Sequence, residues 1–114
     1  MLPHERLEVY WLAQEYVAFV DYLMSSFKRA PRNDVNQLDR AAGSIPYNIG
    51  EGCSDRTPKE RIRFFCYARR STSECHAIFT RLHRRGCVSD LHLRISYSYA
   101  DRISAMLYNL IKAQ

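Results

Sequence analysis

The chain has 114 residues, of which 46% are hydrophobic and 25% charged, and its formal net charge is +5. This length suits one domain, and this composition is that of an ordinary soluble globular protein. No run of about 18 apolar residues occurs, which excludes a membrane-spanning helix. The N-terminal "MLPHERLEVYW" holds charged residues where a secretory signal peptide needs an apolar stretch, so we expect one cytoplasmic domain over residues 1–114.

The first predicted element is a helix over residues 5–28. Its apolar stripe recurs at three-to-four spacing and consists of Leu7, Tyr10, Trp11, Val17, Val20, Leu23, Met24 and Phe27. Pro31 ends this helix, because the residue before a proline disfavours the α region.

The second predicted helix covers residues 33–52, with Asn33 or Asp34 as its N-cap. Its stripe steps by three and four residues through Val35, Leu38, Ala42, Ile45 and Ile49. Pro46 removes one backbone N–H and crowds the carbonyl group one turn earlier, so we expect a kink near it. Gly52 is expected to end the helix in the left-handed conformation.

The third predicted helix covers residues 58–85 and begins with a capping box made by Thr57 and Glu60. Its apolar stripe is the most regular of the four and consists of Phe65, Ala68, Thr72, Cys75, Phe79 and Leu82. Gly86 is expected to end this helix.

The fourth predicted helix covers residues 89–112, with Ser89 as its N-cap. Its stripe consists of Ile95, Tyr99, Ile103, Met106 and Leu110. Short connections make sequential helices antiparallel neighbours, and no strand pattern is present in the sequence. The sequence therefore predicts an all-α fold, an antiparallel up-down-up-down four-helix bundle.

We expect neither a metal nor a cofactor. The four cysteines contain no CxxC pair, and we interpret them as reduced structural thiols. His83 and Cys87 have the i, i+4 spacing of a ligand pair, but Gly86 interrupts the helix between them. The Gly-rich stretch "AAGSIPYNIGEG" lacks the lysine of a phosphate-binding P-loop and the preceding strand of a dinucleotide-binding loop.

Two motifs point to a known family. "QLDRAAGSIPYNIGEG" followed by "RFFCYARRSTSE" resembles the paired signature of a bacterial four-helix-bundle family named after proteins encoded in intervening sequences of 23S rRNA genes. The family pattern is Q-L-x-R-A-A-x-S-I-P-x-N-I-A-E-G, then F-x-x-x-A-R-G-S-x-x-E. This chain departs from it at Gly50, where alanine is usual, and at Arg70, where glycine is usual.

The resemblance implies more about architecture than about chemistry. The resemblance implies an up-down bundle that assembles as a ring-shaped homopentamer. A distant relative, the accessory variability determinant protein of diversity-generating retroelements, is a basic pentamer that binds a reverse transcriptase and nucleic acid. The resemblance therefore implies a homopentamer with nucleic acid, a reverse transcriptase or another nucleic-acid enzyme as a partner.

The positive charge is concentrated in one segment. Residues 53–85 hold nine Lys/Arg and three Asp/Glu, a net charge of +6, whereas residues 1–52 have a net charge of −2. Such asymmetry is typical of a protein with a polyanionic partner. The candidate nucleic-acid-binding residues are Arg61, Arg63, Arg70, Arg81, Arg84 and Arg85. The alternative is a solvated helix end, where cations meet the negative pole of the helix dipole.

The polar residues of the two motifs are interpreted as structural. We expect a buried network that ties the second helix to the third, in which Glu51 pairs with Arg69 or Arg40. Its members are Asn48, Glu51, Arg69 and Glu74. The tyrosines are expected in the core and at subunit interfaces rather than as platforms for bases.

The sequence thus predicts a non-enzymatic oligomeric bundle that binds RNA, DNA or a nucleic-acid enzyme through its basic surface. The alternative is a protein–protein adaptor or scaffold with no nucleic-acid binding, in which the arginines contact an acidic protein surface. A nuclease or hydrolase using Glu51 or Glu74 is disfavoured, because a metal-dependent nuclease clusters several carboxylates.

Overall fold

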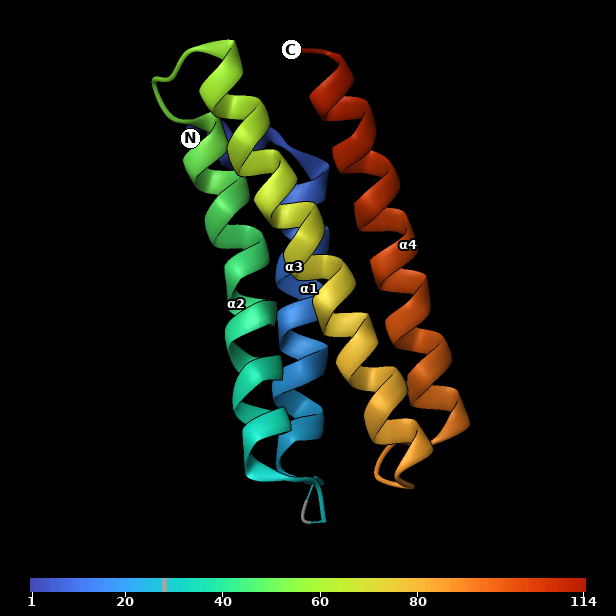
Figure 1. Ribbon diagram of the computed structural model, residues 1–114. Helices are drawn as coiled ribbons and strands as arrows, with labels where there is room; N and C mark the ends of the chain where they lie inside the picture. The colour runs from blue at the N-terminus through green and yellow to red at the C-terminus, as the bar shows by residue number, and fades with distance from the viewer. Residues whose placement is uncertain (28) are drawn as a thin grey trace.

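The computed structural model describes residues 1–27 and 29–114, and its regular structure there is entirely helical. A short 3-10 helix, η1 (Pro3–Arg6), precedes four α-helices: α1 (Glu8–Met24), α2 (Arg32–Cys53), α3 (Pro58–Arg84) and α4 (Asp90–Lys112). The four α-helices pack together into an elongated body with extents of 44 × 23 × 20 Å (Figure 1). The all-α prediction is confirmed.

The helices do not contribute equally to the packing. The α2–α3 pair is the most extensive contact, followed by α3–α4 and α1–α2, and α1 meets α4 over a smaller area. Figure 1 shows both chain termini and the α2–α3 connection at one end of the molecule, and the α1–α2 and α3–α4 connections at the other. α3 is therefore bordered by two extensive partners and presents its remaining face to solvent.

The core confirms the predicted stripes of α2 and α3 most closely. Every residue of the predicted apolar stripe of the third helix is buried, as are Leu38, Ala42, Ile45 and Ile49 of α2. The predicted α4 stripe was only partly right: Ile103 is buried as predicted, but the other buried residues of α4 are Ser96, Ala100 and Leu107, each one position after a predicted residue. A serine and an alanine point inward there, and a search for large apolar side chains passes over both.

Trp11 was also placed wrongly in the predicted core. Its side chain is 51% exposed, and its indole Nε1 donates a hydrogen bond to the carbonyl oxygen of Glu5 at 2.9 Å. This bond joins η1 to the first turn of α1, and the regular α-helix begins at Glu8 rather than at residue 5.

The helix ends follow ordinary capping chemistry at three points. The Thr57 hydroxyl accepts from the Glu60 N–H and the Glu60 carboxylate accepts from the Thr57 N–H, at 3.3 and 3.1 Å, so the capping box is confirmed. The Ser89 hydroxyl accepts from the His92 N–H at 3.1 Å. Gly86 follows α3 with φ of +80°, the left-handed conformation that glycine adopts without strain.

Two end predictions for α2 were wrong. The helix begins at Arg32, so Asn33 and Asp34 lie inside its first turn rather than capping it. It continues through Pro46 to Cys53, and Gly52 is helical rather than left-handed. A Cβ atom at Gly52 would lie 2.5 Å from Phe65 Cε1, so glycine is required there by close packing of α2 on α3.

Within the described residues, no helix combines the length and the apolar character needed to cross a membrane. The same part of the chain contains no group of three or more His, Cys, Asp or Glu side chains arranged to hold a metal ion.

Candidate nucleic-acid interface

Four of the predicted arginines share one exposed stripe of α3, which we call the α3 stripe. Positions 63, 70, 81 and 84 fall within a narrow arc of a helix with 3.6 residues per turn, and their side chains are exposed. With about 1.5 Å of rise per residue, the stripe is roughly 31 Å long. Arg85 is exposed at the C-cap and extends it. The stripe consists of Arg63, Tyr67, Arg70, Glu74, Ala77, Arg81, Arg84 and Arg85.

The remaining candidate, Arg61, lies away from this stripe. Its Nε donates a hydrogen bond to the side-chain oxygen of Gln114 at 2.9 Å, which joins the start of α3 to the C-terminus. Arg61 is also close enough to Cys53 to oppose the effect of burial, which raises the pKa of the Cys53 thiol. The structure therefore separates Arg61 from the other five arginines.

Arg81 belongs to the stripe but also forms an ion pair with a residue of α2. Its Nε donates to the Asp34 carboxylate at 2.9 Å, and the Asp34 side chain is only 11% exposed whereas that of Arg81 is 56% exposed. The pair fastens the first turn of α2 to the C-terminal half of α3. Sequence reasoning missed this ion pair, because the two residues are 47 positions apart.

The C-terminal end of the α3 stripe is hollowed. A shallow depression of about 400 Å³ is lined by Ala77, Thr80, Arg81, Arg84 and Arg85. Nearby, the His83 ring bonds to the Asp90 carboxylate at 2.6 Å, and this hydrogen bond lowers the pKa of Asp90. The acidic residue at the start of α4 is thus paired with His83 rather than with the arginines of the depression.

The N-terminal end of the stripe contains an aromatic residue that sequence reasoning missed. Tyr67 is 38% exposed and lies between Arg63 and Arg70 on the same face of α3. The guanidinium carbon of Arg70 is 5.8 Å from the Tyr67 ring centre, and the Phe64 ring meets Tyr67 edge-on at 5.8 Å. The spacing of i, i+4 and i+7 in "RFFCYARR" is the pattern that could have revealed this grouping.

The four residues predicted to form a structural network are not joined into one. Asn48 Nδ2 donates to the backbone and side-chain oxygens of Ser44, both at 2.9 Å, and the Ser44 hydroxyl bonds to that of Ser71 at 2.7 Å. Asn48 thus does link α2 to α3, but through two serines.

Glu51 has a different partner from either of those predicted. Its carboxylate pairs with Arg56 at 2.7 Å, and Arg56 Nε also donates to the Glu51 carbonyl oxygen at 2.9 Å. Arg40 is exposed and lies elsewhere on α2, so pairing within the α2–α3 connection replaces the predicted pair.

Arg69 and Glu74 lie apart from these groups. The Arg69 guanidinium carbon is 5.4 Å from the Tyr108 ring centre, and its Nε is buried without a hydrogen-bond partner among the described residues. Lys112 Nζ is 5.3 Å from the same ring, so Tyr108 already has two cations beside it. Glu74 is exposed on the α3 stripe.

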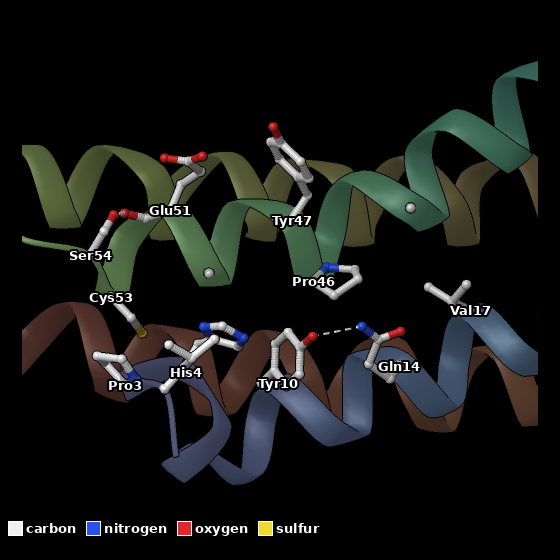
Figure 2. Close-up of a pocket in the computed structure, with 13 residues that line it drawn as sticks. Pro3, His4, Tyr10, Gln14, Val17, Pro46, Tyr47, Glu51, Cys53 and Ser54 are labelled. Carbon is white, nitrogen blue, oxygen red and sulfur yellow. Dashed lines mark hydrogen bonds between the residues drawn. The ribbon is translucent and has the colours of Figure 1, made fainter.

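A cleft lies between α2 and the η1–α1 segment. It measures about 620 Å³, and His4, Tyr10 and Pro46 are among its lining residues. Figure 2 shows the Gln14 amide bonded to the Tyr10 hydroxyl, at 3.0 Å, while Tyr47 and Glu51 point away from α1. The cleft is mainly apolar and brings together no pair of groups suited to acid–base chemistry.

A polar chain crosses the core between α1, α4 and α3. The hydroxyls of Tyr16 and Ser96 are 2.6 Å apart, and His76 Nδ1 is 3.0 Å from the same serine oxygen. Tyr16 and Ser96 are fully buried. Burial raises the pKa of Tyr16 and lowers that of His76, so the tyrosine stays protonated and the histidine favours its neutral form.

Comparison with known proteins agrees with the motif pattern. Residues 5–109, almost the whole chain, match the family described as 23S rRNA-intervening sequence protein. No curated protein matches the chain. The matched region contains η1 in part, α1 to α3 in full and most of α4, including the entire α3 stripe. The chain therefore belongs to the 23S rRNA-intervening sequence protein family.

Proposed function

We propose that this protein is a non-enzymatic oligomeric bundle that binds RNA or DNA through the α3 stripe. The observation that supports this most is the alignment of Arg63, Arg70, Arg84 and Arg85 on one exposed side of α3. Within the described residues, none of these four forms an ion pair with a carboxylate, so their charges remain available. Exposed guanidinium groups in a row suit a phosphate backbone, which they bind in bidentate fashion.

The proposal takes the fold to be an up-down-up-down bundle that assembles as a homopentameric ring. The short connections and their alternation between the two ends of the molecule support the helix order (Figure 1). The resemblance described above supports the ring. Repetition of the α3 stripe around a ring would increase the local potential and therefore the attraction of a polyanion.

A nucleic-acid-processing enzyme, such as a reverse transcriptase, is a second partner that fits this proposal. Such an enzyme would share the same nucleic acid with the bundle. A purely structural adaptor that contacts an acidic protein surface is the competing function, and it predicts no affinity for nucleic acid.

The test uses fluorescence anisotropy to measure binding of labelled single-stranded RNA, single-stranded DNA and duplex DNA at several salt concentrations. The wild type is expected to bind at about 50 mM salt and to weaken steeply by about 200 mM. The double variant Arg84→Gln/Arg85→Gln should reduce the slope of log affinity against log salt by about 2 for a duplex.

The matched control is Arg94→Gln/Arg102→Gln, which removes the same charge from exposed positions on α4. Arg102 lines a hollow with Glu15 of α1, away from the α3 stripe. The control should retain most of the wild-type salt slope. Absence of salt-sensitive binding by the wild type would refute the proposal and favour the adaptor.

A further inference from the structure

The N-terminal half of the α3 stripe differs from its C-terminal half by containing an aromatic ring. Arg63, Tyr67 and Arg70 are consecutive on this face, separated by four and three residues. Side chains at these spacings are about 5–6 Å apart at Cβ. The two arginines are therefore separated by roughly 10 Å along the helix axis, with the phenol ring between them.

The Tyr67 ring has Phe64 at one side, and the Arg70 guanidinium carbon lies 5.8 Å from its centre. Phe64 meets it edge-on at 5.8 Å, and the Arg56 guanidinium carbon lies 4.3 Å from the Phe64 ring centre on the side of the α2–α3 connection. Phe64 is half-buried, whereas Tyr67 remains 38% exposed. The aromatic surface is thus held in place while the phenol stays accessible.

Other exposed aromatic side chains lack this environment. Tyr108 has two cations, Arg69 and Lys112, beside its ring, where Tyr67 has Arg70, and Tyr97 meets His76 at 5.6 Å. Tyr22 and Tyr47 are exposed on α1 and α2, but residues 1–52 are net acidic. Tyr67 is the exposed tyrosine that lies between two arginines of the basic segment.

We propose that Arg63, Tyr67 and Arg70 form a subsite for one unpaired nucleotide, whose base stacks on Tyr67 and whose flanking phosphates contact the two arginines. This inference rests on the proposed function and specifies which form of nucleic acid the α3 stripe prefers. A ring that stands on a single helix reaches a base only when that base is outside a duplex, because paired bases are already stacked on their neighbours. Aromatic stacking beside a positively charged track is the usual basis of single-strand binding.

The charge around the subsite also limits its extent. Glu74 lies one turn after Arg70 and is exposed, so it repels a phosphate at that position. The next arginine on the stripe is Arg81, which is paired with Asp34. The subsite therefore accommodates a short stretch of strand at the N-terminal half of α3 and is separate from the depression near Arg84.

The experiment compares Tyr67→Leu with Tyr67→Phe on three probes of equal length: a single-stranded oligothymidylate, a duplex, and an abasic strand that has the backbone without bases. Tyr67→Leu should weaken binding of the single strand about tenfold, since loss of one stacked base is typically felt at this scale. Tyr67→Phe should stay within about twofold of the wild type, because phenylalanine keeps the ring. Neither variant should alter binding of the duplex or of the abasic strand.

Controls separate stacking from folding and from the general charge effect. Tyr22→Leu removes an exposed tyrosine from α1 and should leave all three affinities unchanged. Thermal unfolding and light scattering of each variant should match the wild type, because Tyr67 is a surface residue. Arg63→Gln/Arg70→Gln should weaken binding of the single strand and the abasic strand alike.

Equal affinity of the wild type and Tyr67→Leu for the single strand would overturn the subsite, while salt-sensitive binding of that strand would leave the proposed function intact. A wild type that binds none of the probes would refute both. A smaller particle in light scattering for Tyr67→Leu would also overturn the subsite, because it would place Tyr67 between copies of this chain.

Discussion

Removal of the Ser96 hydroxyl should destabilise the protein more than removal of the Tyr16 hydroxyl, although the two groups share one hydrogen bond. Both residues are fully buried, and their oxygens are 2.6 Å apart. In Ser96→Ala the Tyr16 phenol loses its partner in a region that water does not reach. An unsatisfied buried hydroxyl costs about 1–3 kcal/mol, so we expect a loss of about 2 kcal/mol in the free energy of unfolding.

Tyr16→Phe should cost less, about 1 kcal/mol, because Ser96 retains His76 as a partner at 3.0 Å. The double variant removes both hydroxyls together and leaves only the half-buried His76 without its serine. Its loss should therefore be smaller than the sum of the two single losses, by about 1 kcal/mol or more.

The assay is urea unfolding followed by far-UV circular dichroism at neutral pH. All variants are compared at one protein concentration, because assembly would add to apparent stability. For a domain of this size, Ser96→Ala should also lower the melting temperature by roughly 8 °C, at about 4 °C per kcal/mol. Strict additivity of the two substitutions, or a Ser96→Ala variant as stable as the wild type, would refute the argument.

Three other predictions concern packing, charge and pH. Gly52→Ala should lower stability by about 1–3 kcal/mol in urea unfolding, because its Cβ would lie 2.5 Å from Phe65 Cε1; an unchanged midpoint would mean that the ring moves aside freely. Asp34→Asn should lower the free energy of unfolding by about 1 kcal/mol, since Arg81 is 56% exposed. The same substitution should strengthen nucleic-acid binding at low salt, because it frees Arg81 from its carboxylate partner; equal or weaker binding would contradict this role. Burial lowers the pKa of His76 below its ordinary value of 6.5, so below about pH 6.5 the unfolded chain takes up a proton that the folded protein resists. Stability should therefore fall as the pH is lowered through that range, and less steeply in His76→Gln; identical pH profiles would show that His76 does not contribute.

The sequence was sufficient for the core faces of α2 and α3, but not for that of α1, where the buried Val9, Leu12 and Tyr16 lie outside the predicted stripe. The stripes of α2 and α3, the Thr57–Glu60 capping box and the turn at Gly86 were all predicted correctly, since each depends on neighbours within a few positions. On α4 the prediction found Ile103 but missed Ser96, because Ser96 is buried for its hydrogen bonds and not for its apolar surface.

In the candidate site too, the features that depend on local spacing were predictable and the contacts between distant residues were not. The alignment of the arginines on α3 follows from helical periodicity, and so could have been derived from spacing alone. The Asp34–Arg81 and Arg61–Gln114 contacts join residues 47 and 53 positions apart, and single-sequence periodicity has no information about such pairs. Glu51 was assigned to Arg69 or Arg40, whereas its partner is Arg56, five residues away in the adjoining connection.

The uneven packing of the helices determines which part of the molecule should open first. α2 and α3 share the most extensive contact and are joined by a short connection, whereas α1 is held by α2 and by a smaller contact with α4. We expect amide hydrogens of η1 and the first turns of α1 to exchange with solvent through local opening, and those in the middle of α2 and α3 to exchange only when the whole domain unfolds. We therefore expect the α3 stripe to lie on the helix pair that exchanges most slowly, and its arginines to keep their spacing when α1 opens locally.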